Sequence, residues 1–566
     1  MGNISNAAHR LVFLTVNSSY SHSSLALPLL HSACCDVANW EWLRYDMTNA
    51  SDVISAVRDI CDLHCDLLAT DLYLFNRQTA IDVLQRIHTL QPECRIAVGG
   101  PECLGEGAEE LLLQYPFLDK IFRGEGEEIF RDYLENFDDP ASSREKIVPA
   151  DGNAVYSDWA ASAYPVKDIF FSADKPFVQI ETSRGCPMKC FYCTSGNTHI
   201  RYRTLEQVKE ELHLLSSKGV KEVRVLDRTF NLPQNRAIEL LKLFRQEFPA
   251  MKFHLELHPQ FLDNALREEL TRALPGQLHI EAGIQCLDPE VQEFSGRRSN
   301  IDDLLDGLKF LCEQKAFVTH ADLLAGLPGQ RLGNIISDTA KLMQINTAEI
   351  QLEVLKALPG TPLRKIAADH GIKHNPSTPY DVMQSNTMSM LDMQHARDLS
   401  RLLDMTYNHQ FLHQPVWLMN RDCPDMVPKL LDFFHQAGGD ASVLWDLKKR
   451  FLFLLDFCQN YQLAEAKREL AWQWLLAGYL QQQGPDEYSC KAQSIPFEAE
   501  HISGDPAVSG ARESRYWSFA MPGKTYFLAY NRQYALNRPA AIWVLKENNS
   551  EYTAEAIKNQ GIENAV

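Results

Sequence analysis

The chain has 566 residues, of which 45 % are hydrophobic and 23 % are charged. These fractions are close to the averages of globular proteins and exclude wholesale disorder and fibrous repeats, while the length predicts about three domains. The formal net charge of −19 argues against a protein that binds nucleic acid or an anionic membrane through a broad basic surface.

The apolar runs and the cysteines predict a cytoplasmic protein. The opening residues lack the charged start, long apolar core and cleavage site of a signal peptide. No apolar stretch approaches the roughly 18 to 20 residues of a membrane span. The 14 cysteines are scattered along the chain, which is typical of free thiols in a reducing compartment rather than of a disulfide framework. We therefore expect no membrane partner.

Residues 1–140 show the pattern of a Rossmann-like domain. Short β-branched runs (LVFLTV, CDLLAT, RIAVGG) alternate with helical patterns such as TAIDVLQRIHTL. This alternation predicts a parallel sheet with helices on both faces, whose ligands bind at the carboxyl ends of the strands. The loops after these runs are rich in small and turn-forming residues, as such a site requires. The polar stretch of residues 141–165 is predicted to be a linker.

A second alternation of strands and helices occupies residues 166–365. Helical patterns such as LEQVKEELHLLSSKG lie between most of its strand-like runs. There are six such runs, at 177–182, 222–227, 252–257, 278–285, 318–329 and 350–360. The count predicts a partial (βα)6 barrel with its active site at the carboxyl ends of the strands. The fold class is therefore α/β.

Residues 366–566 predict a mainly helical C-terminal domain that ends in a small β element. Aromatic-rich helical patterns such as KRFLFLLDFCQNYQ come first, and we interpret their aromatic faces as packing surfaces. The segment YWSFAMPGKTYFLAYN alternates around Pro522 and Gly523 and predicts a hairpin. The run AAIWVL that follows predicts a third strand.

Three cysteines, Cys186, Cys190 and Cys193, lie within eight residues on the loop after the first strand of the predicted barrel. A short loop of this kind can supply three thiolates to an iron-sulfur cluster and leave one iron open. The open iron can chelate S-adenosylmethionine and pass an electron to its sulfonium, which releases a carbon radical. The alternatives are a zinc site completed by His199 and three thiols without function. The apolar pair between the last two cysteines favours a shielded cluster.

The spacing CxxxCxxC after the first strand of a six-unit βα series resembles the signature of the radical S-adenosylmethionine superfamily, over residues 170–365. The resemblance implies that the three cysteines bind a 4Fe-4S cluster and that S-adenosylmethionine binds beside it. The segments VLDRTFN, HIEAGIQ, HADLLAGLPG and LKALPG resemble strand ends that contact this cofactor or the substrate. The residues so implicated are Tyr192, Asp227, Glu281, Gln285, Asp322 and the backbone at Leu358.

The first domain resembles the cobalamin-binding domains that precede such cores, through AVGGPE, a helix and FRGEGE. Domains that bind cobalt from below use a DxHxxG segment with His22 in the ligand position, but Tyr20 and Leu25 replace its acid and its glycine. Three alternatives stay open: His22 binds cobalt, cobalamin binds without a protein ligand to cobalt, or the domain keeps the fold without the cofactor. We favour the second. The cobalamin pocket implied by the resemblance consists of Ser21, His22, Thr70, Leu72, Gly99, Gly100 and Glu125.

The order of domains, with PYDVM at 379–383 and TYN at 406–408, resembles a group of bacterial proteins of unassigned function. The resemblance implies an enzyme that cleaves S-adenosylmethionine reductively, and favours a cobalamin-dependent methyltransferase that acts on an unactivated carbon. The alternatives are a radical enzyme for rearrangement, cyclisation or carbon-sulfur chemistry without cobalamin, and a non-catalytic metal-cluster protein that binds a partner. We expect a small-molecule or peptide substrate, a reducing partner such as flavodoxin or ferredoxin, and no nucleic acid.

Overall fold

The computed structural model describes residues 9–140, 142, 144–162, 164–477 and 479, together with strands at 514–521, 524–531, 543–548 and 551–556. The chain divides into two compact units. The first consists of Met1–Asp338 and Leu352–Ala396, and the second of Thr339–Gln351 and Arg397–Val566. All of the predicted site residues belong to the first unit.

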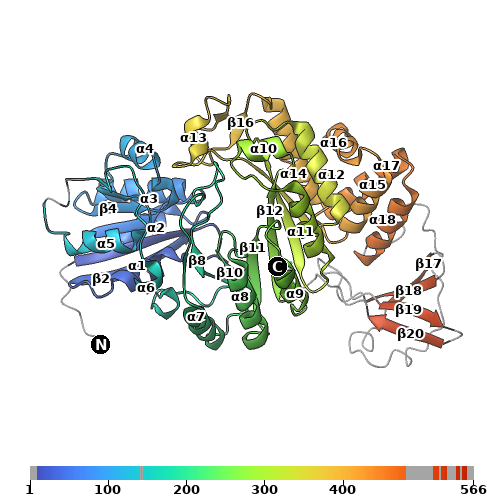
Figure 1. Cartoon of the computed structure of the whole chain (residues 1–566), viewed down its shortest axis with the longest axis horizontal. Coiled ribbons are helices and arrows are strands. Elements are labelled where there is room, and N and C mark those ends of the chain that lie inside the picture. Colours follow the sequence, from blue (N-terminus) through green and yellow to red (C-terminus); the bar gives the residue numbers. More distant parts are fainter. Residues whose placement is uncertain are drawn as a thin grey trace. The chain divides into compact units, whose positions relative to one another are not determined.

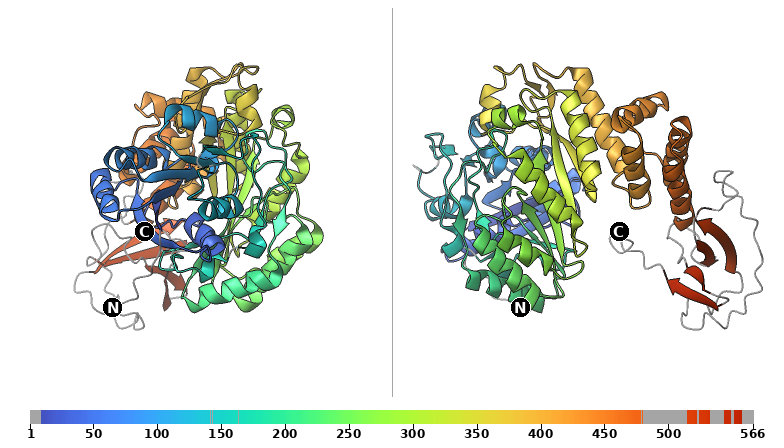
Figure 2. Two further views of the ribbon diagram at one scale, coloured as in Figure 1. Left: turned by 90° about the vertical axis from the view of Figure 1, so that its left-hand side faces the viewer. Right: turned by 45° about the vertical axis from the view of Figure 1, so that its right-hand side comes forward.

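The first sheet has six parallel strands in the order β2-β1-β3-β4-β5-β6, which confirms the predicted Rossmann-like architecture (Figures 1 and 2). Its strands are β1 His9–Asn17, β2 Trp40–Thr48, β3 Leu67–Asp71, β4 Arg95–Gly99, β5 Lys120–Phe122 and β6 Ile147–Val148. The connecting helices are α1 Ala26–Cys34, α2 Val53–Asp62, α3 Arg77–Leu90, η1 Pro101–Cys103, α4 Gly107–Gln114 and α5 Gly126–Glu135.

Both faces of this sheet are buried, which explains the uninterrupted apolar run of β1. Val12, Leu14 and Val16 point into a core that they share with α2, α3 and α4. Leu11 and Phe13 point the other way, into a core that they share with α1 and α5. A strand that is buried on both faces needs apolar residues at consecutive positions. Helices therefore cover both faces, and the carboxyl ends of the strands stay open for a ligand.

The segment predicted to be a linker contributes to the first sheet instead. Its two-residue strand β6 pairs in parallel with β5, and Val155 forms a bridge with Gly124. Ser157 N donates a hydrogen bond of 2.9 Å to the Glu125 carboxylate. These contacts are made mostly by polar groups and the backbone, so no periodic apolar pattern marks the segment. The short elements α6 Trp159–Ser162 and η2 Pro165–Lys167 complete it.

The second sheet has six strands in the order β14-β13-β12-β11-β10-β7, the successive order of a partial barrel. The strands are β7 Val178–Ile180, β10 Glu222–Val225, β11 Lys252–Leu257, β12 Leu278–Gln285, β13 Val318–Ala325 and β14 Glu349–Val354. The helices are α7 Leu205–Ser217, α8 Gln234–Glu247, α9 Asn264–Thr271, α10 Pro289–Phe294, α11 Ile301–Glu313 and α12 Leu332–Ile345. A small antiparallel ladder of β8 Ser183–Arg184 and β9 Arg201–Tyr202 lies after β7.

The strands of the second sheet have one apolar and one polar face. Along β11, Phe253, Leu255 and Leu257 pack into a core with residues of α7, α8 and α9. The alternate residues His254 and Glu256 lie on the opposite face of the strand and are outside this core. The apolar face therefore anchors the helices, and the polar face lines the interior of the partial barrel.

The remaining elements are mainly helical, as predicted. Aromatic contacts within the second unit include Trp445 with Phe434 (5.1 Å between ring centroids) and with Phe453 (5.2 Å), so these faces do pack together. The elements after the barrel strands are α13 Pro362–Ile366, β15 Lys373–His374, β16 Val382–Gln384, α14 Met390–Met405, α15 His413–Asp422, α16 Met426–Gln436, α17 Leu447–Asn460 and α18 Ala464–Leu476. Every helix that the structure describes is too short or too polar to cross a lipid bilayer.

The chain ends in a four-stranded antiparallel sheet in the order β17-β18-β19-β20. Strands β17 Ser514–Met521 and β18 Lys524–Asn531 form the predicted hairpin, whose turn residues Pro522 and Gly523 lie outside the described residues. β19 Trp543–Asn548 matches the predicted third strand. β20 Glu551–Ala556 was not predicted, because its sequence EYTAEA is short and only weakly apolar.

Candidate active site

The cysteine loop, residues 185–200, is closed at its base by the ladder of β8 and β9. Inside the loop, Thr198 N donates a hydrogen bond of 2.9 Å to the Cys186 carbonyl oxygen. Gly185 has a φ of +99°, and a Cβ at this position would lie 2.2 Å from the His199 carbonyl oxygen. Only glycine fits such a turn. The fold therefore presents the cysteines on a compact loop directly after the first barrel strand.

The three thiols suit an iron-sulfur cluster better than a single zinc ion. Cys186 and Cys190 are buried, and Cys193 is partly buried. A zinc ion with bonds of about 2.3 Å holds its thiolates roughly 4 Å apart. Among the described residues, these three sulfur atoms do not form a set that lies within 4.8 Å of one another. The burial of these thiols suits a cluster that is shielded from water.

Two polar side chains flank Cys190. Arg297 donates a hydrogen bond to the Gly283 carbonyl oxygen, and its Nη1 lies 4.0 Å from the Cys190 sulfur. The Tyr192 hydroxyl is buried, and burial raises the pKa of this tyrosine. A guanidinium close to a thiolate favours added negative charge, so Arg297 is placed to stabilise a reduced cluster. Arg297 could not be predicted from the sequence, because nothing in FSGRRSN distinguishes it from a surface arginine.

Asp227 follows β10 and faces the end of β7. Its Oδ1 accepts the backbone N–H groups of Thr182 (2.8 Å) and Ser183 (2.9 Å), and its Oδ2 accepts the Thr182 hydroxyl. The residue is 3 % exposed, and burial raises its pKa. All of these hydrogen bonds go to the segment that leads into the cysteine loop. The structure thus shows a positioning contact for Asp227, whereas the sequence predicted a contact with cofactor or substrate.

The remaining predicted contacts lie on the second sheet or just beyond it. Glu281 on β12 and Asp322 on β13 both lie within 4 Å of His320 Nε2, so the structure brings the two acids together. Burial and the charge of Glu281 raise the pKa of Asp322 to about 9. Gln285 ends β12 at a β-bulge with a φ of +69°. Leu358 follows the end of β14, C-terminal to the other predicted contacts in the sequence.

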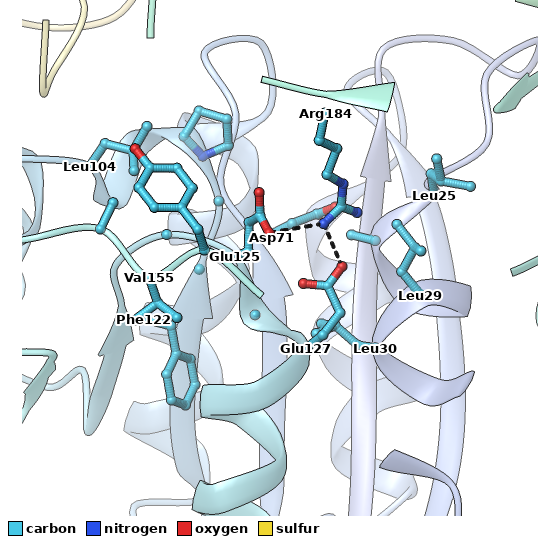
Figure 3. A pocket seen from close by; sticks show the side chains of 18 of the residues that line it. Leu25, Leu29, Leu30, Asp71, Leu104, Phe122, Glu125, Glu127, Val155 and Arg184 are labelled. Atoms are coloured by element: carbon cyan, nitrogen blue, oxygen red, sulfur yellow. Dashed lines mark hydrogen bonds and ion pairs between the residues drawn. The ribbon is translucent and has the colours of Figure 1, made fainter. Parts of the chain in front are cut away.

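A cavity of about 400 Å³ lies between the carboxyl edge of the first sheet and the base of the cysteine loop (Figure 3). The apolar part of its lining comes mainly from α1, β5 and the segment after β6, and includes Leu25, Leu29, Leu30, Phe122 and Val155. Another part comes from residues beside the cysteines, namely Arg184, Gly185, Thr194, Ser195 and Thr198. The cavity therefore connects the first sheet with the cysteine loop.

Three carboxylates surround Arg184 in the wall of this cavity. Its guanidinium lies 2.8 Å from Glu127, 2.9 Å from Glu181 and 3.4 Å from Glu125, and the pairs with Glu127 and Glu125 are seen in Figure 3. Glu125 also forms an ion pair with Arg201. Of these residues, only Glu125 was predicted from the sequence, and Arg184 and Glu127 were not. The sequence did contain a signal for these two residues. ETSRGC carries a basic residue and FRGEGEE is rich in acids, and neither feature is needed to form a strand or a helix.

Four residues of the predicted cobalamin pocket line the cavity: Thr70, Gly99, Gly100 and Glu125. The Thr70 hydroxyl is turned into the sheet, where it donates a hydrogen bond of 2.8 Å to the Leu14 carbonyl oxygen. Leu72 is fully buried and is not part of the lining. A Cβ on Gly100 would lie 2.8 Å from the Leu72 carbonyl oxygen, so the close approach of these two backbones requires glycine.

Ser21 and His22 are not part of the cavity lining. His22 Nδ1 lies 2.9 Å from the Ser19 hydroxyl, and the imidazole packs edge-on against Phe177 with 5.1 Å between ring centroids. Burial and the charge of Arg224 lower the pKa of this histidine, which favours the neutral imidazole. The structure therefore does not bring His22 to the other predicted cobalamin residues.

Comparisons with known proteins agree with this architecture. Residues 180–338 match the family model of the radical SAM superfamily, and residues 368–488 match a model described as "Protein of unknown function (DUF4080)". An uncharacterized methyltransferase of Pyrococcus horikoshii is 23 % identical over 359 residues, which cover 59 % of this chain and 75 % of the relative. The chain spans about half the length of several other curated relatives that it matches.

Two solved structures share the fold over most of the chain. TsrM from Kitasatospora setae, a radical S-adenosylmethionine methyltransferase solved with cobalamin and a [4Fe-4S] cluster, has a TM-score of 0.53 at 16 % identity and covers 68 % of this chain and 83 % of its own. OxsB, a cobalamin-dependent S-adenosylmethionine radical enzyme, has a TM-score of 0.56 at 12 % identity and covers 84 % and 83 %.

The matched segment begins within the first barrel strand, and the three cysteines follow it directly. Members of this superfamily use a 4Fe-4S cluster and S-adenosylmethionine, which agrees with the spacing and burial of the thiols. The expectation of a non-catalytic metal-cluster protein is therefore set aside. The chain is therefore an enzyme with a radical S-adenosylmethionine domain at residues 180–338, and a Rossmann-like domain precedes this partial barrel.

Proposed function

We propose that this enzyme is a cobalamin-dependent methyltransferase that acts on an unactivated carbon of a small-molecule or peptide substrate. The cavity between the first sheet and the cysteine loop carries the proposal, because residues of both parts line it. A cofactor bound there would touch the Rossmann-like domain on one side and the loop of the cluster on the other. A methyl carrier and a radical source must both reach the same substrate, and this arrangement provides for that.

The lining of the cavity fits a corrin cofactor. Its apolar side chains, among them Leu29, Leu30 and Phe122, suit the face of a flat macrocycle. Gly99 and Gly100 at the end of β4 allow a ligand to approach the backbone, as at other sites of this fold. Since His22 packs against Phe177 away from this lining, we infer that the cobalt takes no ligand from the protein.

When bound, the cluster and S-adenosylmethionine supply a carbon radical and cobalamin supplies a methyl group. The chain's own residues hold these groups in place. The three cysteines bind the cluster, Asp227 fixes the segment before them, and Arg297 stabilises added negative charge at Cys190. The polar interior of the second sheet, with Glu281 and Asp322, faces the region in which S-adenosylmethionine and substrate would bind.

Among the similar solved structures, TsrM supports methyl transfer, and OxsB supports the use of cobalamin. TsrM is described with tryptophan as its substrate, and OxsB with aqua-cobalamin and S-adenosylmethionine bound. The substrate of the present enzyme is expected to differ, because the sequence identities are low. We further propose that it works in the cytoplasm with a flavodoxin or ferredoxin as electron donor, since reductive cleavage needs a strong one-electron reductant.

The direct test measures cofactors and products together. The full chain is produced anaerobically with hydroxocobalamin and reconstituted with iron and sulfide, and bound cobalamin is then quantified by its absorbance. We expect about one cobalamin per chain, together with reductive formation of 5′-deoxyadenosine. An intact cluster that cleaves S-adenosylmethionine in a protein without bound cobalamin would refute the methyltransferase proposal and favour rearrangement, cyclisation or carbon-sulfur chemistry.

A matched pair of variants tests the location of the cobalamin site. A Cβ on Gly99 would meet nothing closer than 3.7 Å, so Gly99→Leu extends a side chain into the cavity with little strain on the backbone. We expect this variant to lose cobalamin and to keep its cluster. Gly333→Leu on α12, where an added Cβ meets nothing within 4 Å, is the control and should keep both. Full cobalamin content in Gly99→Leu would place the cofactor elsewhere.

A further inference from the structure

A second cluster of metal-ligand side chains lies inside the partial barrel, apart from the cysteine loop. It consists of His254 on β11, Glu281 on β12 and His320 on β13, three adjacent strands. His254 Nε2 lies 3.0 Å and His320 Nε2 3.5 Å from the same oxygen, Glu281 Oε2. All three ligand atoms lie within 4.8 Å of one another. Within the described part of the chain, this is the one set of three such groups that meets this spacing.

These separations match the coordination shell of one metal ion. Bonds of about 2.1 Å from imidazole nitrogen and carboxylate oxygen place neighbouring ligand atoms roughly 3.0 to 3.4 Å apart around one ion. Two histidines and one carboxylate are also a ligand set used by zinc and by iron(II) in proteins. The Nε2 atoms of both histidines lie close to one carboxylate oxygen, so the three candidate ligand atoms are near enough to one another to bind a single ion.

The surrounding groups orient the histidines for this role. His320 Nδ1 lies 2.9 Å from His279 Nε2. At this distance the two rings can share a hydrogen bond in which His320 Nδ1–H donates to His279 Nε2. In that tautomer His320 Nε2 carries no proton and is free to bind a metal ion. Metal-bound histidines are typically held in this way through their second nitrogen.

A second carboxylate strengthens the case for a cation. Asp322 Oδ1 is buried and lies 3.9 Å from His320 Nε2, and it accepts no hydrogen bond among the described residues. Two carboxylates held together out of bulk water need a proton or a cation to offset their repulsion. Glu281 is the more exposed of the pair, with 30 % of its side chain accessible, so an ion can enter from the barrel interior.

We propose that His254, Glu281 and His320 bind one divalent transition-metal ion, with Asp322 close enough to bind it directly or through a water. His279 is a positioning residue that holds the ring of His320. The site uses none of the cluster cysteines, and its test does not depend on the proposed methyl transfer. The bound ion would link the three barrel strands β11, β12 and β13. In this proposal Glu281 binds the metal ion rather than S-adenosylmethionine.

Zinc is the probe for the test, and the cluster must be removed so that its thiolates do not compete. The full-length, untagged chain carrying Cys186→Ala, Cys190→Ala and Cys193→Ala is stripped with a chelator and titrated with zinc, and bound metal is counted by mass spectrometry. We expect one tightly bound zinc per chain. Cobalt(II) in place of zinc should give visible d–d absorption without a thiolate charge-transfer band, because the proposed ligands contain no sulfur.

Variants made in the same triple-alanine background test which residues bind the zinc ion. His254→Gln and His320→Gln should each lose the zinc, and Glu281→Gln, which keeps the size of the side chain, should weaken binding at least tenfold. His279→Gln should weaken it about 10- to 100-fold, the usual cost of losing an outer-shell partner. His213→Gln, at an exposed imidazole on α7, is the control and should bind as the parent does.

Thermal unfolding of each variant without metal checks that the fold is intact, and zinc should raise the melting temperature of the parent but not of His320→Gln. The absence of a tightly bound zinc in the parent would overturn the proposal. So would zinc binding that is equal in the parent, His254→Gln and His320→Gln. Either result would mean that a proton rather than a metal ion balances the two carboxylates.

Discussion

Replacement of Asp227 distinguishes two possible roles of this residue: positioning of the segment before the cysteine loop, and direct contact with S-adenosylmethionine. In Asp227→Ala, the backbone N–H groups of Thr182 and Ser183 lose their acceptor in a buried place. Each buried donor left unpaired costs about 1–3 kcal/mol, so the variant should lose about 2–6 kcal/mol of its free energy of unfolding. This is a large part of the roughly 5–15 kcal/mol that stabilises an ordinary domain.

Asp227→Asn is the matched control for this loss. Its Oδ1 can still accept both N–H groups, and the Thr182 hydroxyl can turn to accept from the new amide. Only the charge is lost, and neutral hydrogen bonds are weaker than charge-assisted ones by about 1 kcal/mol each, so we expect a cost of about 3 kcal/mol for the three bonds. The asparagine variant should therefore keep its cluster, and the alanine variant should lose iron on reconstitution.

Urea unfolding followed by circular dichroism gives the stabilities, and the iron content after anaerobic reconstitution and gel filtration reports the cluster. Binding of S-adenosylmethionine by equilibrium dialysis is measured on the same samples. A stable Asp227→Asn protein with a full cluster that no longer binds S-adenosylmethionine would refute the positioning role, because the charge would then act on the cofactor. An alanine variant as stable as the wild type would refute the energetic argument.

Three further predictions concern the cluster and the pH dependence of stability. Alanine at any one of the three loop cysteines should abolish formation of 5′-deoxyadenosine, measured by chromatography, and full activity in such a variant would contradict the cluster assignment. Arg297→Met removes a positive charge 4.0 Å from the Cys190 sulfur, so the reduction potential of the cluster, followed by redox titration, should fall by on the order of 100 mV; an unchanged potential would exclude this effect. Burial raises the pKa of Glu211 from 4.5 to about 7, so its contribution to stability is fully present below pH 4.5 and is lost as the pH rises through 7. The loss amounts to about 3 kcal/mol at 1.36 kcal/mol for each pKa unit, and urea midpoints between pH 5 and 8 should depend less on pH in Glu211→Gln.

Much of the fold is predictable because buried faces of strands and helices require apolar residues at regular positions in the sequence. β1 is apolar at consecutive positions since cores lie on both of its faces, and the predicted strand of residues 278–285 coincides with β12. β2 escaped prediction because it is an edge strand whose residues are mostly half-buried or exposed, so WEWLRYDMT lacks a clear apolar face. β6 was not predicted, because two residues are too few to show any periodicity.

The candidate site is predictable where it is local in the chain. The cysteine loop is one short segment, so its spacing alone identifies the three thiols. His254, Glu281 and His320 come together only through the register of three strands, in which Glu281 is opposite His320 and His254 is opposite His279. Spacing along the chain carries no information on that register. The same holds for His22, whose position in the sequence matched a ligand motif while the fold directs its side chain to Phe177.

The placement of the cavity beside the cysteine loop depends on charge as well as on packing. Arg184 lies between the end of β7 and Cys186, and its carboxylate partners come from two domains, Glu181 from the barrel and Glu125 and Glu127 from the start of α5. The side chains of these four residues are 4 to 19 % exposed, so water screens their attraction only weakly. Loss of the Arg184 side chain would leave three carboxylates close together without a cation. This would lower the free energy of unfolding by far more than a surface ion pair contributes to it. A closed network of charges therefore links the first sheet with the segment that leads into the cluster loop.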